Sequence, residues 1–157
     1  LFNNQTYENI FWSCASGCLV WSLYEIIFMW LYANEKLNSI NFDSNPIYYC
    51  LLFVLIPIWQ VAYFYFSHRL THWKPLYKWV HYLHHKNVNT GPWSGLSMHP
   101  IEHIIYFGTV LIHLFIPSDP LHVIWHLLFN GLAPAAGHSG YNEISFKRYG
   151  RKLSWQP

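Results

Sequence analysis

The sequence predicts an all-α membrane protein, a multi-pass transmembrane helical bundle with a histidine-rich helical cap on its cytosolic side. Of its 157 residues, 53% are hydrophobic and 10% are charged, whereas an ordinary soluble domain has roughly 25% charged residues. Two apolar runs are long enough to cross a bilayer, and eleven histidines supply much of the polar content. The length suits one domain, which we take as residues 1–157.

The first predicted spanning helix covers residues 10–33, and the second covers residues 46–66. Each is a mostly apolar run of about 20 residues, the length that a spanning helix needs. Glu25 lies inside the first run, and an acid in that setting usually faces the interior of a bundle. Pro57 lies inside the second run, where we expect it to kink the helix.

Residues 103–138 are predicted to form a helical hairpin with a tight Pro-Ser-Asp-Pro turn at residues 117–120. Basic residues gather in the polar segment 67–100 and in the tail 139–157, whereas the two connections on the other side hold one Lys and no Arg. The positive-inside rule therefore predicts that both segments face the cytosol. The hairpin supplies the even number of crossings that this orientation requires.

The charge of the chain argues against nucleic acid as a partner, because a net charge of +2 and a pI of 8.4 are too mild. The membrane would be the endoplasmic reticulum in a eukaryote or the inner membrane in a bacterium. The chain does not begin with Met and has no evident signal peptide, so we expect it to be a fragment of a longer protein.

The strongest chemical signal is five histidines within 18 residues, directly after the second spanning run. His68 and His72 are four residues apart, and His81-x2-His84-His85 repeats that spacing. On a helix such positions share one face, so their imidazoles can converge on a metal. Adjacent His84 and His85 point about 100° apart, so one of them could serve a second metal.

The residue types also limit the metal and the class of site. Neutral imidazole suits Zn, Cu, Fe or Ni. Glu102 and Glu143 are the only acids near the cluster, which excludes a ferritin-like carboxylate di-iron site. The sequence has no HExxH motif, so a zinc protease is unsupported.

The remaining histidines fall into two groups. His99-Pro-Ile-Glu-His103 repeats the four-residue spacing, and His138 follows the last apolar run. His113, His122 and His126 lie farther along the hairpin, roughly 15 Å or more from its cytosolic end at 1.5 Å per residue. We interpret these three as interior polar contacts, with a haem site using His113 and His126 as the lesser alternative.

Taken together, these motifs resemble the fatty acid hydroxylase / sterol desaturase superfamily. The resemblance covers about residues 63–149. The matching motifs are His68-x3-His72, His81-x2-His84-His85, the run 89–102 that leads into a His-Pro step, and Gly137-His138-Ser139-Gly140-Tyr141.

The resemblance implies an integral membrane enzyme with a non-haem di-iron centre that hydroxylates or desaturates a lipid, sterol or fatty acyl, with O2. Zinc could replace iron in the isolated protein. Electrons would come from a cytochrome b5 or a ferredoxin with its reductase. The implied metal ligands are His68, His72, His81, His84, His85 and His138, with His99 and His103 as less secure candidates.

Two departures from the family pattern and several alternatives stay open. The family usually continues with a final HxxHH, which we expect beyond Pro157, and Asn142 stands where some members have a histidine. The same scaffold could cleave an ether lipid. A non-enzymatic metal-binding or metal-transport protein is the main alternative, although ligands gathered at one face favour an enzyme. The sequence leaves the substrate open.

Overall fold

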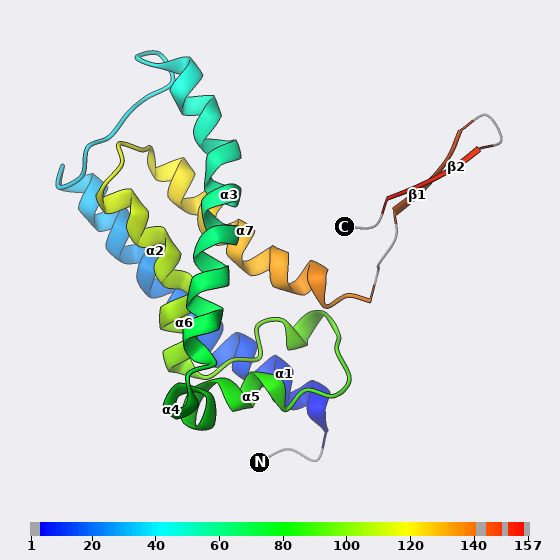
Figure 1. The fold of residues 1–157 in the computed structure, drawn as a ribbon. Helices are drawn as coiled ribbons and strands as arrows, with labels where there is room; N and C mark the ends of the chain where they lie inside the picture. Colours follow the sequence, from blue (N-terminus) through cyan, green and yellow to red (C-terminus); the bar gives the residue numbers. More distant parts are fainter. Residues whose placement is uncertain (1–3, 141–143, 149–150, 156–157) are drawn as a thin grey trace.

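The computed structural model describes residues 4–140, 144–148 and 151–155, and the side chains of residues 4–140 (Figure 1). Helices dominate, as predicted. In the tail, β1 (Ile144–Arg148) pairs antiparallel with β2 (Arg151–Trp155). The all-α prediction did not include this hairpin, although Ile-Ser-Phe-Lys has the alternation typical of a strand.

The N-terminal helix is longer than predicted. α1 (Gln5–Trp12), a π-helical turn η1 (Ser13–Gly17) and α2 (Cys18–Ala33) follow one another as a single helix of 29 residues. The side chain of Asn4 caps its start by accepting a hydrogen bond from the Thr6 N–H at 2.8 Å. The prediction of a helix over 10–33 therefore missed its first five residues, which are more polar.

The second long helix, α3 (Pro46–Thr71), also extends beyond its predicted range. Asn45 caps it by accepting from the Tyr48 N–H at 3.2 Å, and Pro46 occupies its first turn, where the missing N–H is not needed. The helix continues through Pro57 and ends at Thr71 instead of residue 66. His68 therefore lies on the last turn of α3.

Both long helices are apolar enough to cross a membrane. Only 22% and 17% of their most apolar windows are buried inside the molecule, whereas the core helix of a soluble protein would be mostly covered. Large side chains such as Leu19, Ile26, Val54 and Ile58 are at least half exposed. These outward apolar faces are the surfaces that lipid would cover.

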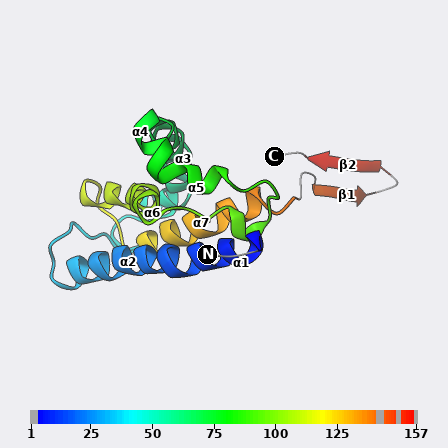
Figure 2. The same cartoon turned by 90° about the horizontal axis from the view of Figure 1, so that it is seen from below.

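A short helical segment follows α3 and carries the second histidine motif. It consists of α4 (Lys74–Leu76), a π-helical turn η2 (Tyr77–His81) and α5 (Tyr82–His85). Trp73 is extended, with φ −61° and ψ 132°, and turns the chain between α3 and α4. The segment lies at one end of the bundle (Figures 1 and 2).

The predicted hairpin is present. After a loop with the 3-10 turn η3 (Pro92–Ser94), its first arm is α6 (Pro100–Phe107) and the 3-10 helix η4 (Gly108–Leu114). Its second arm is α7 (Pro120–Gly137), which Asp119 caps. α7 returns the chain to the end of the bundle that holds α4 and α5, so this end also carries His138 (Figure 1).

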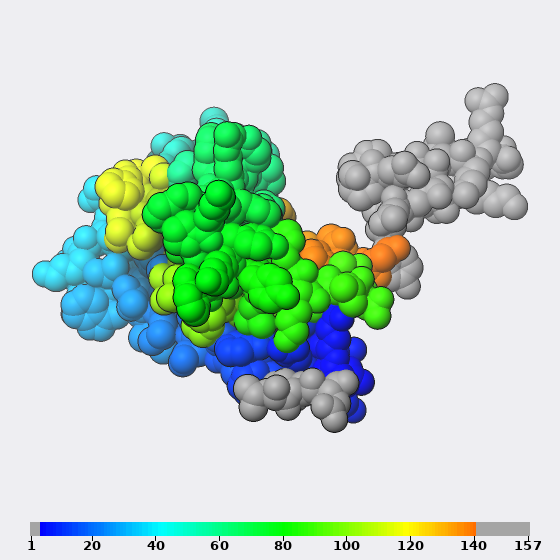
Figure 3. Space-filling model, turned by 60° about the horizontal axis from the view of Figure 1, so that its bottom comes forward, coloured from blue at the N-terminus to red at the C-terminus, as the bar shows by residue number. Residues whose placement is uncertain are grey.

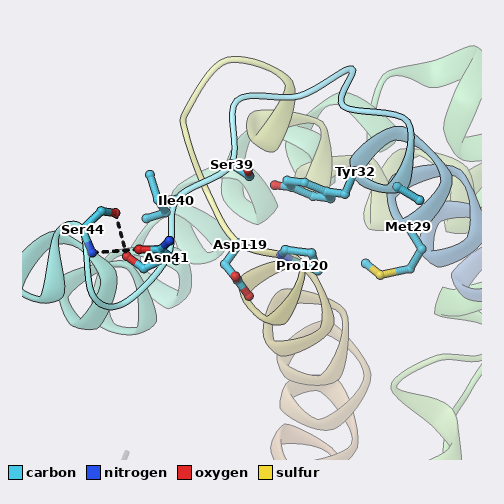
Figure 4. Close-up of a pocket in the computed structure, with 9 residues that line it drawn as sticks. Met29, Tyr32, Ser39, Ile40, Asn41, Ser44, Asp119 and Pro120 are labelled. Atoms are coloured by element: carbon cyan, nitrogen blue, oxygen red, sulfur yellow. Dashed lines mark hydrogen bonds between the residues drawn. The ribbon is translucent and has the colours of Figure 1, made fainter.

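The core lies where α2, α6 and α7 meet, and includes Phe28, Phe107 and Leu127. α2 and α7 approach closely at Gly131, where an added Cβ would lie 2.3 Å from the Trp21 ring. At the opposite end from α4 and α5, the α2–α3 connection and the start of α7 line an open pocket of about 480 Å³ (Figure 4).

Candidate metal centre

Four of the predicted ligands lie together where α3 ends. Their candidate ligand atoms all lie within 4.8 Å of one another, and the group consists of His68, His72, His81 and His85. His68 lies on the last turn of α3 and His72 caps its C-terminal end, whereas the other two come from the segment that follows. The turn at Trp73 brings the two motifs face to face, with the ring centroids of His68 and His81 4.6 Å apart.

The distances within this histidine cluster suit a single small ion. The Nε2 atoms of His68 and His72 are 3.2 Å apart, and those of His81 and His85 are 2.9 Å apart. Two nitrogens bonded at about 2.0–2.1 Å to one tetrahedral ion lie roughly 3.3 Å apart. Small rotations of the rings therefore bring the nitrogens to coordinating positions.

Glu102 bonds to the side of the His81 ring that faces away from the cluster. The Nδ1 of His81 and the Oε1 of Glu102 are 2.6 Å apart, and the two residues are 0% and 4% exposed. With its Nδ1 engaged, His81 presents Nε2 to the cluster, as metal-binding histidines commonly do. The second oxygen, Oε2, has no hydrogen-bond partner among residues 4–140, so the carboxylate can accept a further donor.

A pair of histidines lies beside the cluster. The ring of His84 is 5.6 Å from that of His81 and 5.7 Å from that of His138. His84 and His85 both neighbour His81, but His84 also faces His138 whereas His85 faces His72. The Nδ1 of His138 is 2.7 Å from the Ser94 hydroxyl, whereas the Nδ1 of His84 is buried without a partner in the part of the chain whose side chains are described.

The surroundings of His84, His85 and His138 favour the neutral ring, which leaves a nitrogen lone pair for a metal. Burial, and after it the charge of neighbouring imidazoles, lowers the pKa of His84 to about 4. The pKa of His85 and that of His138 are also lowered, in both cases mainly by burial. A group of histidines that resists protonation favours metal binding, because a bound imidazole must be deprotonated.

His99 and His103 do not join this group. His99 caps α6, where its Nδ1 accepts a hydrogen bond from the Ile101 N–H at 3.2 Å. His103 is fully buried, with Nδ1 2.9 Å from the Ser16 hydroxyl and Nε2 3.0 Å from the Leu96 carbonyl oxygen. Both ring nitrogens of His103 are therefore occupied, and these contacts do not support the less secure ligand assignments.

The histidines of the hairpin are interior polar contacts, as predicted. The Nε2 of His113 is 3.1 Å from the Nδ1 of His126. Their other nitrogens contact the hydroxyls of Ser118 and Thr109, at 2.8 and 3.2 Å respectively. His122 contacts the Tyr49 carbonyl oxygen at 2.9 Å. The haem alternative lacks support, because both nitrogens of His113 and His126 already have partners.

An apolar cavity of about 290 Å³ opens beside His84 and His138. Its walls come from α3, α6, α7 and the loop before α6, and include Val61, Phe64 and Phe129. Gly95 is required in this loop, because a Cβ there would lie 2.5 Å from the Pro134 carbonyl oxygen. The cavity can hold part of an apolar molecule next to the histidines.

Charged residues surround the same end of the molecule. Arg69, Lys74 and Lys78 lie on α3, α4 and η2, and Lys86 bonds to the Glu8 carboxylate at 2.6 Å. This bond ties α5 to the N-terminal helix, and Figure 3 shows the two side by side. Tyr141, Asn142 and Glu143, which the sequence places close after His138, lie outside the described residues.

Some participants could not be recognised from the sequence. Ser94 is fully buried and contacts His138, but the run 89–102 that contains it gives no sign of this contact. Glu102 was a candidate because it is one of two acids near the cluster, but its partner His81 lies 21 residues away. Both contacts depend on how the loop between α5 and α6 folds back.

Comparison with known proteins supports the family resemblance seen in the sequence. Residues 53–156 match the fatty acid hydroxylase family. A Delta(7)-sterol 5(6)-desaturase of Candida albicans is 30% identical over 100 residues, which cover 59% of this chain and 25% of that protein. Methylsterol monooxygenase 1 of Gallus gallus is 28% identical over 115 residues, which cover 71% of this chain and 39% of that protein.

A Delta(7)-sterol-C5(6)-desaturase of Nicotiana tabacum is 27% identical over 74% of this chain and 41% of its own length. The chain thus spans about two fifths or less of these curated relatives. No solved structure matches it. The family match covers well over half of the chain, including the whole histidine cluster, so the chain belongs to the fatty acid hydroxylase family within the fatty acid hydroxylase / sterol desaturase superfamily.

Proposed function

We propose that this chain is the histidine-bearing part of a membrane-bound non-haem di-iron oxidoreductase that hydroxylates or desaturates a lipid with O2. The observation that carries the proposal is the cluster His68, His72, His81 and His85 beside an apolar cavity. The names of the relatives, a sterol desaturase and a methylsterol monooxygenase, favour a sterol, with a fatty acyl chain as the alternative.

The residues of the chain fit the iron that this family is taken to use. The four clustered imidazoles would hold one ion, and His84 with His138 would contribute to a second. Glu102 orients His81 so that its Nε2 faces the ion. Bound iron would supply the redox chemistry with O2 that attacks an unactivated C–H bond, which no protein side chain can do alone.

The protein would do the rest by positioning. The cavity walls exclude water from the lipid and hold its reacting carbon near His84 and His138. The lowered pKa of His84 keeps that ring neutral, so it does not repel a cation. The two rings that are most accessible, His72 and His85, lie on the solvent side of the cluster.

We further propose that the protein is multi-pass, with the histidine cluster facing the cytosol. The basic residues Arg69, Lys74 and Lys78 lie at the cluster end of the bundle, in agreement with the positive-inside rule. The membrane would be the endoplasmic reticulum in a eukaryote. The same positive charge would attract an acidic electron donor such as a cytochrome b5 or a ferredoxin.

The decisive experiment compares the full-length protein with a His72→Ala/His85→Ala variant. Both side chains are exposed, so the variant should fold. We expect the unaltered protein to bind iron and to oxidise a sterol or fatty acyl lipid when O2 and an electron donor are supplied. The variant should lose both the iron and the activity.

A His99→Ala variant is the matched control, because His99 is also a partly exposed histidine but caps a helix instead. It should retain iron and activity. Retention of both by the double variant would refute the proposal. Iron binding without lipid oxidation, under conditions in which a known family member is active, would favour the non-enzymatic metal-binding alternative.

A further inference from the structure

Two residues that line the apolar cavity carry a buried polar atom without a partner among residues 4–140. One is His84, which lies beside the histidine cluster, and the other is Gln60. Gln60 lines the cavity and is 3% exposed. Its Oε1 is buried and has no hydrogen-bond partner among residues 4–140. Buried carbonyl oxygens in folded proteins almost always accept a hydrogen bond, so this oxygen lacks a donor that its described neighbours do not supply.

The neighbours of Gln60 determine which atom of its amide lacks a hydrogen-bond partner. The Tyr106 hydroxyl donates to the Asn130 carbonyl oxygen at 2.9 Å, which uses its hydrogen. Gln60 also bonds to this hydroxyl, and the bond must come from the amide N–H, because only the hydroxyl oxygen remains available. The amide oxygen is therefore the free group, and it can only accept.

Gln60 is too far from the histidine cluster to bind the same metal. It precedes His68 by eight residues on α3, which is about 12 Å along the axis at 1.5 Å per residue. A metal–ligand bond is only about 2 Å long. The cavity nevertheless extends from Gln60 to His84 and His138, so a molecule within it can contact both.

We propose that Gln60 is a specificity-determining residue that accepts a hydrogen bond from a hydroxyl group of the lipid. The preferred lipid then carries this donor within reach of Gln60, away from the carbon that is oxidised. A lipid without the donor fills the same space but leaves Oε1 unpaired, and it binds more weakly for that reason. This inference rests on the proposed function, since it takes the cavity to be the lipid site.

The test measures binding of two labelled probes, octadecan-1-ol and octadecane, to the full-length protein in detergent. The probes differ only in the hydroxyl. We expect the unaltered protein to prefer octadecan-1-ol by about tenfold or more. Gln60→Leu removes the acceptor and should abolish the preference.

Val61→Ala is the matched control, because Val61 is the next residue of α3 and lines the same cavity with an apolar side chain. It should weaken both probes alike and leave the preference intact. If Gln60→Leu does not fold, Gln60→Met provides the same comparison with a side chain of similar length.

A preference that persists in Gln60→Leu, or no preference in the unaltered protein, would overturn the inference. The readout is binding without turnover, so it does not depend on iron. Loss of oxidation with an intact probe preference would refute the proposed function alone, whereas oxidation without any probe preference would refute this inference alone.

Discussion

Two groups of histidines in this chain have opposite surroundings. In the hairpin, His113, His122 and His126 have protein partners for both ring nitrogens. At the end of α3, the Nδ1 of His81 bonds to Glu102, but its Nε2 faces another imidazole nitrogen, 2.9 Å away in His85. The first group is complete without a ligand, and the second group is not.

The difference shows why burial alone does not identify a metal ligand. His103 and His81 are both 0% exposed, yet only His81 has its outer nitrogen turned toward other imidazoles. A histidine whose two nitrogens are satisfied stabilises the fold, while one whose nitrogen meets other nitrogens is arranged for a cation. The following variants separate these two roles, from the largest expected effect to the smallest.

His85→Ala should weaken iron binding by more than about 100-fold, because it removes one of four clustered ligands and outer partners alone are worth 10–100-fold. The exposed position predicts little change in the thermal stability of the metal-free protein. Titration of the metal-free protein with Fe(II) under anaerobic conditions measures the effect. Equal affinity in the variant and the unaltered protein would remove His85 from the ligand set.

His126→Leu should have the opposite effect. It leaves the His113 Nε2 and the Thr109 hydroxyl without their partner, which we expect to destabilise the protein by about 2–3 kcal/mol. Iron bound per folded chain should not change. Unfolding in detergent, combined with metal analysis, tests both statements, and a loss of iron at full stability would place His126 in the metal site.

Glu102→Gln should reduce iron affinity by about 10–100-fold without removing a ligand. The amide can still contact the Nδ1 of His81 but cannot supply the negative charge that strengthens it. Fe(II) titration of the variant measures this affinity. Glu102→Asp provides a comparison, because it keeps the charge on a shorter side chain. An unchanged affinity in both variants would leave Glu102 a packing residue only.

His99→Ala should cost about 0.5–1 kcal/mol of stability, since it removes the cap of α6. Iron affinity should stay within error of the unaltered protein. This is the smallest effect and the sharpest contrast with His85→Ala, because both changes replace a histidine with alanine near the same end of the bundle. A clear loss of iron would restore His99 to the ligands.

Local spacing made most of the fold and the histidine cluster predictable. The two long helices follow from apolar runs, and the pairs His68/His72 and His81/His85 follow from the four-residue repeat of a helix face. His103 has the same spacing from His99 but does not join the cluster. Its Nδ1 contacts the hydroxyl of Ser16, which lies 87 residues before it in the chain. Such distant partners, like the Tyr106 contact that orients Gln60, cannot be read from a local pattern.

The limits of the two long helices show a similar division. Hydropathy located α3 but ended it at residue 66, because Ser67, His68 and Arg69 are polar. The structure continues the helix to Thr71, whose hydroxyl donates to the His68 carbonyl oxygen at 2.7 Å. The helix therefore outlasts its apolar run by more than a turn, and the metal site begins on these extra residues.

His81 lies between solvent and the apolar cavity, and this position affects how reactants reach the site. His72 and His85 open toward water, whereas His84 borders the apolar cavity, and the fully buried His81 lies between them. Small polar reactants would thus reach the site from solvent, and an apolar substrate would reach it through the cavity. Neither would have to leave before the other enters, so a tightly held lipid would not block the approach of electrons.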